Sequence, residues 1–211
     1  MTASAETQAA DADARPSLRA RTRRAVQAEL LEAAERLFMA QGYAATSVDQ
    51  IATAAGMSRR SFFRYFSSKE DLVLGRYERL GEEWLKALAG RPLNEPLWTS
   101  MRRVMDVTLA IYADEDKSRR LAAMDRVVNV SATLRAGQLE RFDRVQDLLA
   151  GLARERAAAV GHPWASDDPA PRAIVGAAFA CFVAGYFSAQ ATASSVASAV
   201  DRAMSIITVH A

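Results

Sequence analysis

Apolar residues recur along this chain at spacings of three and four, which is the period of an amphipathic helix. The first such segment ends just before Gly42, a residue suited to a helix C-terminus. No stretch alternates between apolar and polar residues in the manner of a strand. We therefore predict an all-α fold of about nine helices, including helices near residues 20–41, 59–66, 67–88, 96–113, 116–131, 135–160, 171–191 and 194–209.

Two short helices are expected after the first long one. Ser47 precedes the first of them as an N-cap, and Asp49 or Gln50 can close a capping arrangement. Gly56 is free to adopt a left-handed turn, and Ser58 caps the second short helix. Two short helices joined across a glycine turn predict a helix-turn-helix.

The charge of the chain is concentrated around this motif. Half of the residues are apolar and a quarter are charged, as in a globular protein, and the net charge is only +2. Residues 15–70 nevertheless carry ten basic and five acidic side chains, a charge of +5, which leaves −3 for the remainder. The basic end favours a polyanionic partner such as nucleic acid, although a solvated basic surface has the same composition.

Candidate catalytic and metal-binding chemistry is sparse. The single Cys181 lies on an apolar segment and is expected to be a small core residue in a reducing, cytoplasmic compartment. His162 and His210 stand apart from any cluster with metal-ligand spacing, and no glycine-rich phosphate loop is present. The longest apolar run, residues 174–184, is shorter than the roughly 20 residues of a membrane span. We therefore expect that the protein is not an enzyme, that it binds no metal or cofactor, and that it has no membrane anchor.

Several segments resemble the signature of the tetracycline-repressor (TetR) family of transcriptional regulators in both order and spacing. They are Gly42-Tyr43, Thr46-Ser47-Val48, Ile51-Ala52, Ala55-Gly56-Met57-Ser58 and the run Ser61-Phe62-Phe63-Arg64-Tyr65-Phe66-Ser67-Ser68-Lys69-Glu70-Asp71-Leu72. The match covers about residues 20–75, and the remainder is similar only in length and helical pattern. Residues 1–18 are rich in Ala, Asp and Thr and lack an apolar run, so a disordered leader is expected there. The resemblance implies a helix-turn-helix DNA-binding domain (19–66) and a helical effector-binding and dimerisation domain (67–211).

The second helix of such a motif enters the major groove with its N-terminus toward the bases. Arg59 and Arg60 stand at that end, and a guanidinium can pair bidentately with guanine, so they are the predicted base-reading residues. Arg60 replaces a small residue found in many members, and it either widens readout or faces a phosphate. The resemblance adds further DNA-contacting positions: Ser47, Ser58, Phe63, Arg64, Tyr65 and Lys69.

Three further details of this region bear on its expected contacts with DNA. Phe63 stands where many members have Tyr, so a hydroxyl-to-phosphate bond is absent there. Phe62 and Phe66 are expected in the core rather than on DNA. A cluster of arginines precedes the motif and forms either an arm that reaches DNA or a solvated lead-in to the first helix. Its members are Arg19, Arg21, Arg23 and Arg24.

The segment near residues 171–191 is apolar almost all round and must be covered by other helices. Similarity to the family implies that it and the last helix form a four-helix bundle with a second copy, although part of their apolar surface must serve the intramolecular core. The expected dimer residues are Phe182, Tyr186, Val196, Val200, Met204 and Ile207.

The resemblance also implies an effector pocket among the helices of the C-terminal domain. Methionine and aromatic side chains suit an adaptable apolar site, although each is also an ordinary core residue. The candidate lining consists of Trp84, Trp98, Met101, Met105, Tyr112, Met124, Phe142 and Phe179. The expected effector is apolar or similar to acyl-CoA.

These features together predict a ligand-responsive transcription regulator, a repressor that binds a palindromic operator as a homodimer and is released by a small molecule. The alternative is a helical small-molecule-binding protein without DNA binding. The basic helix-turn-helix favours the regulator.

Overall fold

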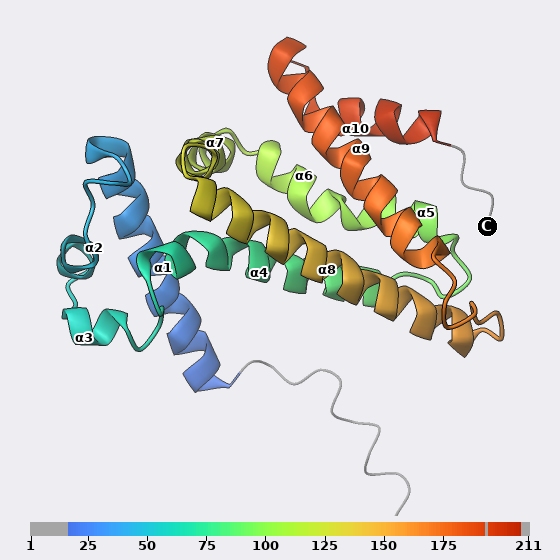
Figure 1. Ribbon diagram of the computed structural model, residues 1–211, viewed down its shortest axis with the longest axis horizontal. Coiled ribbons are helices and arrows are strands. Elements are labelled where there is room, and N and C mark those ends of the chain that lie inside the picture. The colour runs from blue at the N-terminus through green and yellow to red at the C-terminus, as the bar shows by residue number, and fades with distance from the viewer. Residues whose placement is uncertain (1–16, 193, 208–211) are drawn as a thin grey trace, which may run out of the picture. The chain divides into compact units, whose positions relative to one another are not determined.

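The computed structural model describes residues 17–192 and 194–207, and within them every regular element is a helix (Figure 1). This confirms the predicted all-α fold. The chain divides after Leu72 into two compact units. Residues 1–16 of the predicted leader lie outside the described residues, and the first helix begins at Leu18.

The first unit contains α1 (Leu18–Gln41), α2 (Val48–Ala54), α3 (Arg59–Phe62) and the first residues of α4 (Lys69–Ala89). The helices of the motif are short, so tertiary packing rather than helix propensity must hold them. A small apolar core performs this task. It consists of Leu30, Ala33, Ala34, Phe38, Ile51, Ala52, Phe62 and Phe66, each at most 5% exposed.

The turn between α2 and α3 follows the predicted chemistry. Ser47 Oγ accepts a hydrogen bond from Gln50 N while Gln50 Oε1 accepts one from Ser47 N, which completes a capping box. Gly56 has a φ of 68°, a conformation that favours glycine, and Ser58 caps α3 by accepting a hydrogen bond from Ser61 N. Both short helices of the helix-turn-helix are therefore capped at their N-termini by serine side chains.

The second unit comprises the rest of α4 and six further helices in the described residues. They are α5 (Leu97–Val104), α6 (Asp106–Tyr112), α7 (Glu115–Asn129), α8 (Ala132–Ala159), α9 (Ala170–Thr192) and α10 (Val196–Ile206). Where one helix is predicted over residues 96–113, the structure has two. The helical ladder tightens at Met105, whose carbonyl accepts hydrogen bonds from both Thr108 N and Leu109 N.

Helix α9 packs against α10, α8 and α5 in the second unit (Figure 1). It approaches α10 closely, because a Cβ at Gly185 would lie 2.7 Å from the backbone nitrogen of Val200. By length and composition alone, α9 is the one described helix that could cross a membrane. The core helix of a folded domain has the same composition, and Cys181 on this helix is buried as predicted.

Candidate nucleic-acid interface and effector unit

Helix α3 is a single turn that ends at Phe62, so the predicted helix over residues 59–66 is too long. Residues 63–65 form a turn in which Arg64 N and Tyr65 N donate to the carbonyls of Ser61 and Phe62. Phe62 is fully buried and Phe66 is 4% exposed, which confirms their prediction as core residues. These two rings anchor the turn from beneath and leave its outer side to polar groups.

The outer side of α3 is basic and accessible. Arg59, Arg60 and Arg64 are exposed, and Phe63 is 46% exposed. Arg59 Nη1 donates to Asp49 Oδ2 at 2.8 Å, and its guanidinium carbon lies 5.6 Å from the centroid of the Phe63 ring. Phe63 therefore lacks a hydroxyl for a phosphate, but its ring lies beneath the guanidinium of Arg59.

Lys69 lies at the start of α4 and is largely occupied within the first unit. Its Nζ donates to the carbonyl oxygens of Tyr43 and Thr46, both at 2.8 Å, and lies 4.0 Å from the centroid of the Tyr43 ring. The Tyr43 hydroxyl donates to Glu70 Oε1 at 2.7 Å, and this bond lowers the pKa of the Glu70 carboxyl. Lys69 thus joins the loop after α1 to α4, with one of its three N–H donors left over.

One member of the N-terminal arginine cluster contacts the motif. Arg23 Nη1 donates to the carbonyl of Arg64 at 3.4 Å, and its guanidinium carbon lies 5.8 Å from the centroid of the Tyr65 ring. The basic start of α1 therefore lies beside the turn that follows α3. Arg19, one helical turn before Arg23, is exposed on the same face of α1.

The predicted pocket residues of the second unit are mostly packed against one another. Trp84 contacts Phe179 edge-to-face at 4.9 Å between ring centroids, and its Nε1 donates to Thr108 Oγ1. Trp98, Tyr112 and Phe142 are partly accessible. The remaining members are buried, namely Trp84, Met101, Met105, Met124 and Phe179.

A polar cluster beside these rings was missed by the sequence analysis. Arg76 on α4 forms an ion pair of 2.5 Å with Asp125 on α7 and also donates to the hydroxyl of Tyr77. Gln138 Nε2 donates to the same hydroxyl at 2.7 Å, and Tyr186 donates weakly to Asp125 at 3.5 Å. The sequence held a signal for this cluster, because Arg76 places a charge next to Tyr77 on the otherwise apolar face of α4.

This cluster has unused hydrogen-bonding capacity. The Nε atom of Arg76 is buried and has no hydrogen-bond partner among the described residues. Tyr112 lies on Tyr186 with ring centroids 5.2 Å apart, and burial raises the pKa of its hydroxyl above the ordinary range. A part-buried guanidinium with one unused donor, bonded to the Tyr77 hydroxyl, is suited to a ligand that carries oxygen acceptors.

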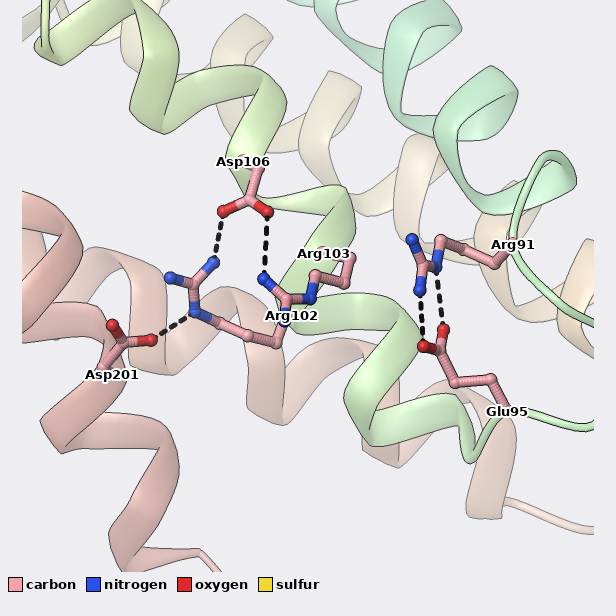
Figure 2. A network of polar contacts seen from close by, with 6 residues as sticks. All are labelled: Arg91, Glu95, Arg102, Arg103, Asp106 and Asp201. Carbon is pink, nitrogen blue, oxygen red and sulfur yellow. Dashed lines mark hydrogen bonds and ion pairs between the residues drawn. The ribbon is translucent and has the colours of Figure 1, made fainter.

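A second ionic network ties together the far end of the unit (Figure 2). Arg102 on α5 donates to Asp106 at 2.6 Å and to Asp201 on α10. In the loop before α5, Arg91 makes two hydrogen bonds to Glu95, of 2.8 and 2.5 Å, and these lower the pKa of Glu95 to about 2. Figure 2 shows two separate groups: Arg91 and Glu95 pair within the α4–α5 loop, while Arg102 joins α5 to α10.

An open pocket of about 390 Å³ lies beside this network. Its walls combine cationic, anionic and small apolar groups from α4, the following loop, α5 and α6. They are Glu83, Lys86, Ala87, Gly90, Arg91, Arg103, Asp106 and Val107. The sequence analysis did not identify this pocket, because its walls come from segments without a continuous pattern.

The predicted dimer residues divide into two groups. Val200 is fully buried and Met204 is 4% exposed, so both serve the core of their own protomer. Phe182, Tyr186 and Val196 are partly accessible, and Ile207 is 38% exposed. The exposed apolar side chains of α9 and of the C-terminal end of α10 are Val183, Phe187, Ile206 and Ile207, and the first three of these were not predicted.

Comparison with known proteins agrees with this architecture. Residues 30–75 match the family described as bacterial regulatory proteins, tetR family. The chain is 34% identical over 165 residues to the HTH-type transcriptional regulator TcmR of Streptomyces glaucescens, an alignment that covers 76% of this chain and 71% of TcmR.

Solved structures show the same fold at low sequence identity. A TetR-family regulator from Syntrophomonas wolfei superimposes with a TM-score of 0.64 at 18% identity, over 87% of this chain and 93% of that one. SmeT, the repressor of the Stenotrophomonas maltophilia multidrug efflux pump SmeDEF, gives a TM-score of 0.57 at 20% identity, over 84% and 86%. Together with the capped helix-turn-helix and the helical second unit, these matches show that the chain belongs to the TetR family of bacterial transcriptional regulators.

Proposed function

We propose that this chain is a repressor that binds a palindromic operator as a homodimer and leaves it when a small molecule occupies the second unit. The observation that carries the proposal is the exposed arginine pair, Arg59 and Arg60, at the N-terminus of a helix anchored by buried Phe62. A guanidinium in this position reaches the edge of guanine in the major groove.

Phosphate contacts complete the proposed interface. Ser47 and Ser58 lie at helix N-termini, where hydroxyls and backbone N–H groups suit an anion. Arg64 and Tyr65 follow α3, and the last free donor of Lys69 is available to a phosphate. Arg23 holds the start of α1 beside this surface, which favours the interpretation of the N-terminal arginines as DNA-facing.

Dimerisation is proposed through α9 and α10. Phe187 is 63% exposed and Ile206 is 81% exposed, and large apolar side chains of this kind are typical of an interface. A two-fold dimer would place two α3 helices in successive major grooves about 34 Å apart. Phe182 and Ile207 remain candidates beside them.

The effector is proposed to bind among α4, α6, α7, α8 and α9, where Tyr112 and Phe142 meet the Arg76 cluster. The neighbour SmeT has been solved in complex with triclosan, so this fold accommodates that compound in SmeT. The apolar or acyl-CoA-like ligand class remains part of the proposal. Differential binding to the DNA-free conformation would shift the protein from its operator.

Anisotropy titrations on a labelled duplex selected from a random library test this proposal. The double variant Arg59→Gln, Arg60→Gln is expected to lose the preference for the selected duplex, while the double variant Arg119→Gln, Arg144→Gln keeps it. Arg119 on α7 and Arg144 on α8 are exposed and form surface ion pairs with Asp116 and Glu140, so this control matches the change in charge. A wild-type chain that selects no sequence, with its fold intact, would leave the alternative of a ligand-binding protein without DNA binding.

A further inference from the structure

Asp49 and Arg59 join the two helices of the motif by an ion pair that contributes little to its stability. The Nη1 and Oδ2 atoms are 2.8 Å apart, yet the two side chains are 62% and 57% exposed. Water screens an ion pair of this kind. Asp49 is not required as a cap either, because Ser47 and Gln50 already form the complete capping box of α2.

The pair does restrict the side chain of Arg59. Asp49 accepts a hydrogen bond from one terminal nitrogen, and the guanidinium carbon lies over the Phe63 ring, 5.6 Å from its centroid. An arginine side chain otherwise samples many rotamers, and ordering it on DNA would weaken binding. The ion pair and the ring therefore favour one orientation of Arg59 before DNA binds. Four of its five N–H donors remain for a partner.

Arg60 provides the contrast within the same helix. It is exposed and makes no hydrogen bond or ion pair among the residues that the structure describes. A side chain without a fixed orientation can follow a phosphate charge but is poorly prepared for a bidentate pairing. The two neighbouring arginines therefore differ in what holds them.

We propose that Asp49 is a positioning residue for sequence readout, which holds Arg59 toward a guanine edge while Arg60 supplies affinity for any duplex. The inference rests on the proposed DNA-binding function. Asp49 also places a negative charge beside the phosphates, which opposes binding to every sequence. Its removal is therefore expected to move affinity and discrimination in opposite directions, which simple structural damage does not do.

The test uses the full chain and duplexes selected from a random library by the wild-type protein. Affinity is measured by fluorescence anisotropy at fixed ionic strength for the selected duplex, for versions with each guanine pair replaced, and for an unrelated duplex. The variants are Asp49→Ala, Asp49→Asn and, as a control for the loss of a carboxylate, Glu32→Ala on α1. Glu32 is exposed and makes no ion pair among the described residues.

Asp49→Ala is expected to bind the unrelated duplex more tightly and to lose about fivefold or more of its discrimination at one guanine pair. Asp49→Asn is expected to keep more of that discrimination, because its side-chain oxygen still accepts a hydrogen bond from Arg59. Unchanged discrimination in Asp49→Ala, or a parallel loss of affinity for all duplexes, would overturn the inference. A wild-type chain that selects no sequence would instead overturn the proposed DNA-binding function, and this inference with it.

Discussion

Lys69 shows how a residue suggested for DNA contact can first serve the fold. Its charge lies against two backbone carbonyls and an aromatic face, all from the segment between α1 and α2. The DNA-binding positions of the family were assigned from sequence similarity, which does not reveal such contacts. At residue scale, the DNA contact of Lys69 stays a prediction, and sequence similarity missed the structural role that this side chain also has.

Replacement of Lys69 by methionine is expected to lower the free energy of unfolding by about 1–3 kcal/mol, because two carbonyls lose a charged donor. The measurement is urea denaturation at neutral pH. Lys117→Met is the matched control, since Lys117 is an exposed residue that pairs with Asp114 on the surface, and a change within about 0.5 kcal/mol is expected there. Equal stability of the Lys69 variant and the wild-type chain would contradict the structural role.

Glu95 provides a prediction for the acid range. Arg91 and Ser100 hold its pKa at about 2 in the folded protein, below the unfolded value of about 4.3. A lowered folded pKa stabilises the protein above about pH 4.3, and this contribution is lost as the pH falls toward 2. Arg91→Gln is therefore expected to weaken the decline in unfolding free energy between pH 5 and pH 3, measured by urea denaturation. The control Arg144→Gln should retain the wild-type pH profile, and a parallel profile in Arg91→Gln would argue against the ion pair.

At the scale of elements, periodicity predicted the long helices well and the short ones less well. Caps and Gly56 located α2 and α3, but the end of α3 depends on a turn that packs Phe62 and Phe66 inward. The division of residues 96–113 occurs at Met105, which is fully buried in the core, and no proline or glycine marks it in the sequence. The Arg76 cluster was missed because its members come from separate helices, and helical periodicity does not show which helices meet.

The contact between α9 and α10 gives a test of helix packing. Gly185→Ala would bring a methyl group within 2.8 Å of the Val200 backbone and is expected to reduce stability by about 1–3 kcal/mol. Gly151→Ala is the control, because Gly151 lies in α8 with no atom within 4 Å of an added Cβ, and a gain of about 0.5–1 kcal/mol is expected. Thermal denaturation of both variants measures the difference. Similar stabilities would show that α10 does not lie so close to α9.

At the scale of the whole molecule, the proposed function requires a dimer as well as a binding motif. The sequence predicted apolar residues on the last two helices but could not separate core from surface, because both classes follow the same helical period. Val200 and Met204 proved to be core residues, whereas Phe187 and Ile206 are exposed. The candidate interface is therefore best defined by exposure in the structure.

Phe187→Asp is expected to convert a dimer into monomers, because it places a charge in the proposed apolar interface. Sedimentation velocity at micromolar concentration measures the change. Leu148→Asp on α8 is the control, since Leu148 is 52% exposed and lies outside the proposed interface, and this variant should remain dimeric. A monomeric wild-type chain, or a dimeric Phe187→Asp variant, would exclude this interface.

The most direct test of the central claim is a footprint of the full chain on DNA flanking its own gene, at moderate salt. The account predicts two protected patches, related by two-fold symmetry and about one helical turn apart, that disappear when Arg59 and Arg60 are both replaced. Protection that is absent, or that persists unchanged in the double variant, would contradict the assignment of α3 as the element that reads DNA.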